Sequence, residues 1–188
     1  DMQDALRHWL YRQPLYRLTL RGCAPKQLTD IEMPADRGDS ANGRILAAGE
    51  IPHGQRRIPI DGALWTAAGD DLALARHLHG FAWLDDIAAA GDADAWRCGR
   101  ELAVSWLSSQ DRWHPLSWRA DVLGTRLFHW LRHHRHLLTL DAEAGEAFLK
   151  SLAEQARHLA RVSGRMKTDA GAFAAVRVQA VNSSRVAS

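Results

Sequence analysis

The chain has 188 residues, of which 46% are hydrophobic and 24% charged, and its formal net charge is +2. This mixture is typical of one globular domain and excludes collagen-like and wholly disordered chains. The small net charge gives no general signature of nucleic-acid binding, and no apolar run approaches the roughly 20 residues that cross a bilayer.

The N-terminal third is predicted to be an arm of mixed structure. Residues 1–21 are predicted to form a helix interrupted near Pro14, because proline lacks a backbone donor and clashes with the preceding turn. Residues 23–42 show no periodicity and are expected to form an extended connector. Weak alternation over residues 43–60 predicts a small β-hairpin, with Pro59 at an edge.

The rest of the chain has helical periodicity. Apolar residues at spacings of three and four predict helices over 70–91, 92–107, 121–138 and 141–165. The first two are separated by Gly91 alone, so we expect them to pack as antiparallel neighbours. Acidic residues at the start of the last helix and basic residues at its end suit the helix dipole.

These elements define three expected segments. Residues 1–69 are the N-terminal arm, residues 70–165 the helical hairpins, and residues 166–188 a loose or truncated tail. The predicted fold is mainly α, with antiparallel αα-hairpins that form part of an incomplete (α/α) toroid. Four long helices are few for a closed ring, so we expect the array to continue beyond Ser188.

Three aromatic segments occur in a distinctive order. They are LHGFAWL at residues 78–84, WHPLSWR at residues 113–119 and RLFHWL at residues 126–131. Together with the preceding helix and hairpin, they resemble the N-terminal region of bacterial heparinase II/III-like proteins, over roughly residues 5–163. One difference is that His129 stands where that family commonly has asparagine.

The resemblance implies a polysaccharide lyase that cleaves uronate-containing chains by β-elimination, with a toroid followed by a β-sandwich. The catalytic tyrosine and histidine of such enzymes lie beyond the region that matches this chain, so no catalytic residue is expected here. The tyrosines of this chain, Tyr11 and Tyr16, both lie in the first predicted helix. We therefore expect a portion that contributes to the substrate groove and is inactive by itself.

Candidate substrate-binding residues lie between residues 112 and 136, a segment rich in arginine and histidine. Arg126, His129 and His133 step along one strip of a predicted helix, where they could meet an anionic sugar, or could form the solvated shoulder of an amphipathic helix. The tryptophans could stack on sugar rings or fill spaces between helices. The full candidate set is Arg126, His129, Trp130, Trp113, Trp118, Arg119 and His133.

No metal site or cofactor is predicted. His129 and His133 have the spacing of a metal-binding pair, but no glutamate follows His129, and Arg132 would repel a cation. Asp85 and Asp86 diverge on a helix by about 100°, so they are expected to be surface or interhelical partners of arginine rather than a catalytic pair.

Two functions are carried forward. The first is the helical part of a lyase, with an acidic polysaccharide and the rest of the parent protein as partners. The second is a non-catalytic helical binding or scaffold domain for an acidic polymer or a protein. Neither nucleic acid nor a membrane is expected as a partner, and the compartment, bacterial periplasm or cytoplasm, stays open.

Overall fold

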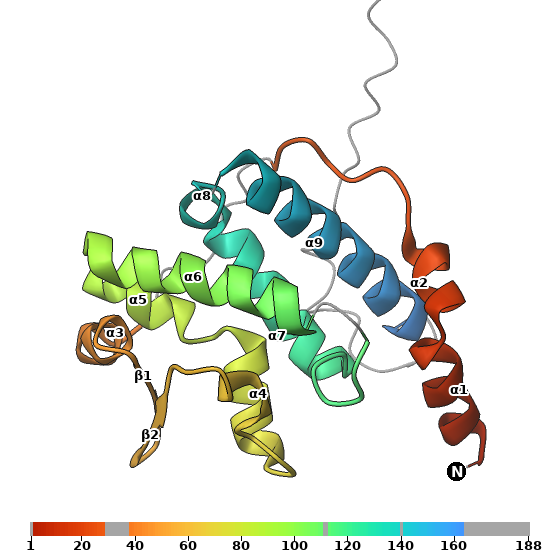
Figure 1. Cartoon of the computed structure of the whole chain (residues 1–188), viewed down its shortest axis with the longest axis horizontal. Helices are drawn as coiled ribbons and strands as arrows, with labels where there is room; N and C mark the ends of the chain where they lie inside the picture. The colour runs from red at the N-terminus through yellow and green to blue at the C-terminus, as the bar shows by residue number, and fades with distance from the viewer. Residues whose placement is uncertain (1, 29–37, 111–112, 140, 164–188) are drawn as a thin grey trace, which may run out of the picture.

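The computed structural model describes residues 2–28, 38–110, 113–139 and 141–163, and it is mainly helical over these ranges (Figure 1). The elements are α1 (Met2–Arg12), α2 (Pro14–Leu20), α3 (Ser40–Ala47), β1 (Glu50–His53), β2 (Arg56–Pro59), the short 3-10 helix η1 (Leu64–Thr66), α4 (Leu72–Gly80), α5 (Leu84–Ala90), α6 (Ala93–Gln110), α7 (Ala120–Arg132), α8 (His134–Leu137) and α9 (Ala142–Ser163). None of the described helices is long and apolar enough to cross a membrane.

The predicted interruption of the first helix is confirmed. Helix α1 ends at Arg12, and α2 begins at Pro14, where the missing backbone donor costs nothing because the first turn leaves its N–H groups unpaired. Figure 1 shows α1 and α2 at one edge of the molecule, beside the last turns of α9.

The β-hairpin is confirmed, but it is shorter than predicted. Strands β1 and β2 are antiparallel, with Ile51 opposite Ile58 and Pro59 opposite Glu50. Residues 40–47 form α3 rather than connector and strand, because the Asp39 side chain accepts a hydrogen bond from the backbone of Ala41 and caps the helix. Residues 29–37 of the predicted connector lie outside the described residues.

The helix predicted over residues 70–91 is divided into α4 and α5. Phe81 adopts a left-handed backbone conformation (φ 59°) that ends α4. This turn places its ring in the core, 4.8 Å from the ring of Trp83 and 5.8 Å from that of Trp65. Aromatic packing thus outweighs the cost of the left-handed backbone conformation, roughly 1 kcal/mol. The spacing of apolar residues in the sequence does not predict this break.

The later helices follow the prediction with shifted ends. Helix α6 continues to Gln110, past the predicted break, and there the hydroxyls of Ser108 and Ser109 donate to carbonyls one turn earlier rather than to groups that would end the helix. The helix predicted over 121–138 is divided at His133 into α7 and α8. Helix α9 begins after Asp141, whose side chain accepts from the backbone of Ala144.

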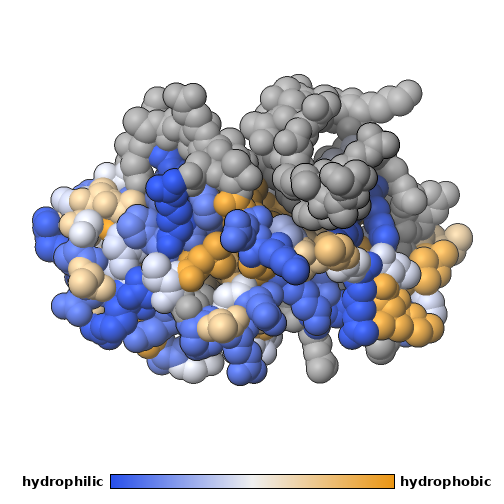
Figure 2. Space-filling view, turned by 90° about the horizontal axis from the view of Figure 1, so that it is seen from above, coloured by the Kyte–Doolittle hydropathy of each residue, from blue (hydrophilic) through white to orange (hydrophobic). Residues whose placement is uncertain are grey.

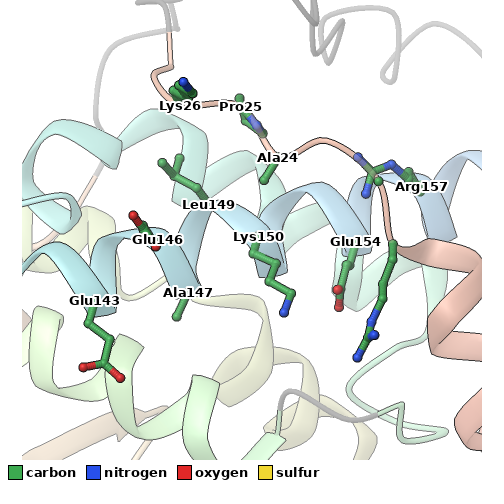
Figure 3. Close-up of a pocket in the computed structure, with 12 residues that line it drawn as sticks. Ala24, Pro25, Lys26, Glu143, Glu146, Ala147, Leu149, Lys150, Glu154 and Arg157 are labelled. Atoms are coloured by element: carbon green, nitrogen blue, oxygen red, sulfur yellow. The ribbon is translucent and has the colours of Figure 1, made fainter.

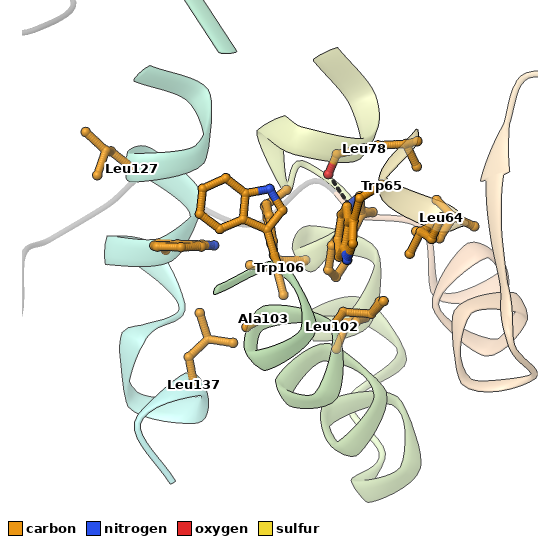
Figure 4. Close-up of a cluster of buried hydrophobic side chains, with 14 of the residues drawn as sticks. Leu64, Trp65, Leu78, Leu102, Ala103, Trp106, Leu127 and Leu137 are labelled. Atoms are coloured by element: carbon orange, nitrogen blue, oxygen red, sulfur yellow. Dashed lines mark hydrogen bonds between the residues drawn. The ribbon is translucent and has the colours of Figure 1, made fainter. Parts of the chain in front are cut away.

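The core lies where α4, α6 and α7 meet η1, and it is rich in tryptophan (Figure 4). Trp106 and Trp130 are fully buried and meet edge to face with ring centroids 5.5 Å apart. Trp83 is also fully buried, and its indole N–H donates to the carbonyl of Leu78 (3.3 Å).

The mainly helical class with a small antiparallel hairpin is therefore confirmed. The expected division at residues 69 and 165 stays a prediction. The tail expected over residues 166–188 lies outside the described residues.

Candidate functional site

Arg126, the first candidate ligand-binding residue, lies in the core rather than on a surface. Its guanidinium is fully buried, with its central carbon 4.2 Å from the centroid of Trp106. It donates from Nε to Gln155 (2.7 Å) and from NH1 to the carbonyls of His79 and Ser117 (both 2.9 Å). Burial lowers the pKa of Arg126 to about 9. Arg126 therefore ties α7 to α9, to the end of α4 and to the turn before α7.

Trp130 is fully buried beside Arg126, with its ring 4.7 Å from that of Phe148 and 5.3 Å from that of Phe81. Arg119 is exposed at the start of α7 and forms an ion pair with Asp121 (3.1 Å). The structure thus places these two candidates in different surroundings, and their binding roles stay predictions.

His129 and His133 converge on Asp85 of α5. Oδ1 of Asp85 lies 3.1 Å from Nδ1 of His129 and 2.7 Å from Nε2 of His133, and its Oδ2 lies 3.7 Å from Arg132. Burial acts to raise the pKa of Asp85, but the two imidazoles and Arg132 outweigh it and hold that pKa well below its usual range. Asp86 points elsewhere, and its Oδ1 accepts from the backbone of Asp39 (2.7 Å).

Trp113 and Trp118 lie beside the N-terminal helices. They line a cavity of about 490 Å³ together with Tyr11, Tyr16 and residues of α2. The hydroxyl of Tyr16, one of the lining residues, shares a hydrogen bond of 2.6 Å with Nδ1 of His158. Burial, reinforced by the charge of Arg161, lowers the pKa of His158 to about 4, so its imidazole is neutral at pH 7. This phenol and imidazole could exchange a proton.

The rim of this cavity is cationic and continues into an exposed apolar strip. Arg12, Arg17 and Arg21 line the cavity, and Leu18 belongs to both the cavity and the strip. Figure 2 shows apolar side chains gathered at the right-hand end of the molecule, where α1 and α2 lie. The apolar strip consists of the exposed large side chains Met2, Leu6, Trp9, Leu10, Leu15 and Leu18.

A second, larger hollow of about 890 Å³ lies where residues 21–26 run along α9 (Figure 3). Its charged side chains are of both signs, and Lys150 lies between Glu146 and Glu154 along α9. Arg157 donates to the carbonyls of Leu20 and Cys23 and so holds the crossing segment. This hollow has no concentration of one charge and is a weaker candidate for a specific site.

Sequence analysis did not find two of these groupings. The pairing of Tyr16 with His158 joins residues 142 positions apart, and no local spacing could indicate it. The sequence predicts Asp85 as a partner for arginine, and the only local signal of this cluster is the four-residue spacing of His129 and His133.

The comparisons with known proteins give one curated match that bears on function. The chain is 31% identical over 131 residues to FtsZ-localized protein C of Caulobacter vibrioides (strain NA1000 / CB15N). The alignment covers 66% of this chain and 22% of that protein, so the chain spans about a fifth of the curated relative it matches. No family model matches the chain. No solved structure matches it either.

This result corrects the resemblance to heparinase II/III-like proteins. The relative found carries the name of an FtsZ-localized protein, and no lyase family model matches. The predicted polysaccharide lyase activity, and the carbohydrate binding that followed from it, are therefore wrong. The aromatic segments that suggested the resemblance contribute to the core, where Phe81, Trp83, Trp118 and Trp130 are buried.

Proposed function

We propose that this chain is a non-catalytic helical docking module with a role in cell division, and that it binds FtsZ. One observation carries the proposal, namely the apolar strip on α1 and α2. Its members are 46% to 87% exposed, in a chain whose other large apolar side chains are mostly buried over the described residues. Contiguous exposed apolar side chains are unusual on a protein surface and commonly mark an interaction site.

The strip has the spacing of a docking face. Met2, Leu6 and Trp9 are four and three residues apart, which places them on one side of α1, and Leu15 and Leu18 repeat this spacing on α2. Aromatic and leucine side chains on one helix face suit an apolar groove or helix of a partner protein. The arginines at the rim of the neighbouring cavity suit acidic residues at the edge of such a contact.

The relative's name supports FtsZ as the partner, because it records localisation with that protein. A fluorescent fusion of the full natural protein, viewed with FtsZ labelled in a second colour, tests the proposal. We expect the two signals to coincide, and Leu6→Ser with Leu15→Ser to disperse the fusion. The exposed pair Arg97→Ser with Glu101→Ser, on α6, serves as the matched control and should not alter the localisation.

A fusion that never coincides with FtsZ, or a strip variant that localises as the unaltered protein does, would overturn the proposal. The strip side chains are exposed, so their replacement should change the free energy of unfolding by no more than about 0.5 kcal/mol. Loss of localisation in that variant then reports on docking rather than on folding.

We further propose that the helices are hairpins of a larger αα toroid. The packing of α5 against α6 and of α7 against α9 supports this arrangement. A crystal structure of the full natural protein tests it. Further hairpins that close a ring with α4 and α7 would agree with the proposal, whereas an independent bundle would contradict it.

A further inference from the structure

Three metal-ligating side chains meet between α5 and α7, outside the proposed docking surface. The potential ligand atoms of Asp85, His129 and His133 all lie within 4.8 Å of one another. His129 lies in the last turn of α7, and His133 is the residue that follows α7 and joins it to α8. Asp85 lies in the first turn of α5, one residue after Leu84, which is fully buried and fixes the start of that helix.

The distances are close to those that a bound cation requires. Ligand atoms about 2.0–2.1 Å from a tetrahedral zinc ion are roughly 3.3 Å apart. Oδ1 of Asp85 is 3.1 Å from His129 and 2.7 Å from His133. The two imidazole nitrogens lie within 4.8 Å of each other, so binding a cation would require the imidazoles to turn closer together around it.

The burial of the cluster also favours a defined site. The side chains of His129 and His133 are 10% and 7% exposed, and that of Asp85 is 17% exposed. Surface histidine pairs that bind metals adventitiously are more exposed and lack a third ligand. Here the low exposure of all three side chains restricts them to a few orientations, which favours one defined geometry around an ion.

Arg132 is the feature that opposes a cation. Its NH1 lies 3.7 Å from Oδ2 of Asp85, whereas both imidazoles contact Oδ1. A group that holds the far oxygen of a carboxylate orients the near oxygen toward a metal, as outer-shell partners do in metal sites. The positive charge of Arg132 should weaken binding but not prevent it.

We propose that Asp85, His129 and His133 bind a divalent cation of the zinc class through Oδ1, Nδ1 and Nε2, with water in the remaining position. Two imidazoles and one carboxylate are a donor set that zinc and neighbouring d-block ions prefer over magnesium or calcium. The cation would join α5 to α7 and so stabilise the fold of the docking module without depending on FtsZ binding.

Calorimetric titration of the chelator-treated chain with zinc chloride tests this site. We expect one zinc ion per chain and a rise in melting temperature on binding. Asp85→Asn and His133→Gln should each weaken binding at least tenfold. His136→Ala is the matched control, because His136 is exposed and lies three residues after His133. His53→Ala is a second control, in which the histidine removed lies near another one: the ring of His53 is 4.8 Å from that of His77. Both controls should bind within twofold of the unaltered chain.

A second measurement on the unaltered chain covers the case in which a variant does not fold. Imidazole ¹⁵N spectra should show zinc-induced shifts at Nδ1 of His129 and Nε2 of His133, and no shift of comparable size at other histidines. Absence of stoichiometric binding, equal losses in the cluster and control variants, or zinc-induced shifts at other histidines alone would each overturn the proposal.

Discussion

The hydroxyl of Tyr16 lies 2.6 Å from Nδ1 of His158, and this hydrogen bond fastens α2 to α9. Arg17 reinforces the attachment through an ion pair of 3.0 Å with the buried carboxylate of Glu154. The apolar strip is therefore carried partly on a helix that is anchored to the body of the protein. An anchored surface loses less conformational entropy on binding than a loose segment would.

Tyr16→Phe should lower the free energy of unfolding by about 1–2 kcal/mol, because it removes a hydrogen bond and leaves a buried imidazole nitrogen unpaired. Urea denaturation measures this change. Tyr11→Phe is the control, since Tyr11 contacts the same imidazole edge-on through its ring, 5.1 Å away. Equal stability of the two variants would show that the Tyr16 hydroxyl does not anchor α2.

The stability of the protein should fall in mild acid. Burial lowers the pKa of both His79 and His158 to about 4, with nearby Arg126 and Arg161 respectively adding to the effect. Below pH 6.5 the unfolded chain binds protons at these positions that the folded chain does not, so stability rises with pH between about 4 and 6.5. Lowering the pH from 7 to 5 should therefore reduce the free energy of unfolding by on the order of 2 kcal/mol for each of these histidines.

Denaturation curves recorded across this pH range check the sign and the size of the effect. His158→Phe should reduce the change in unfolding free energy between pH 7 and pH 5 by about half. Replacement of exposed His136 should leave most of that change in place. A stability that stays constant from pH 7 to pH 5 would contradict the assignment of neutral buried imidazoles.

Arg126→Lys should destabilise the protein by about 3 kcal/mol or more. A lysine ammonium cannot reproduce the planar set of donors that reaches Gln155 and the carbonyls of His79 and Ser117. Arg119→Lys, at an exposed ion pair, should change stability by less than about 0.5 kcal/mol. Thermal denaturation of both variants provides the comparison, and equal melting temperatures would refute a structural role for Arg126.

Two glycine substitutions should have opposite effects. A Cβ atom at Gly43 would lie 2.2 Å from the carbonyl oxygen of Asp86, so Gly43→Ala should push α3 away from α5 and cost more than about 2 kcal/mol. At Gly145 of α9, by contrast, a Cβ atom would have no neighbouring atom within 4 Å. Gly145→Ala should therefore stabilise the protein by about 0.5–1 kcal/mol, through higher helix propensity. Chemical denaturation should show a lower free energy of unfolding for Gly43→Ala and a higher one for Gly145→Ala.

The helices could be predicted from the sequence because their apolar spacing is regular and their caps are local. Asp141 and Pro14 mark helix starts for reasons that depend on a few neighbouring residues. The break at Phe81 could not be predicted in this way, because it depends on tryptophans from η1, α6 and α7 that come together only in the fold.

The candidate sites were less predictable than the helices. The strip of arginine and histidine on α7 appeared continuous in sequence, yet Arg126 is turned into the core while His129 and His133 contact Asp85. The aromatic order that suggested a lyase is explained by core packing, which many helical proteins share. The buried residues chiefly determine the fold, whereas the exposed strip is the surface on which the proposed function depends.

The most direct test of the central claim is the dissociation constant of the purified chain for purified FtsZ, measured by biolayer interferometry. We expect saturable binding, weakened at least tenfold by Leu6→Ser with Leu15→Ser and changed by less than twofold by Arg97→Ser with Glu101→Ser. Anionic lipid vesicles, measured in parallel, should bind no better than an empty sensor. No saturable binding to FtsZ, equal binding by both double variants, or strip-dependent binding to vesicles alone would contradict the account.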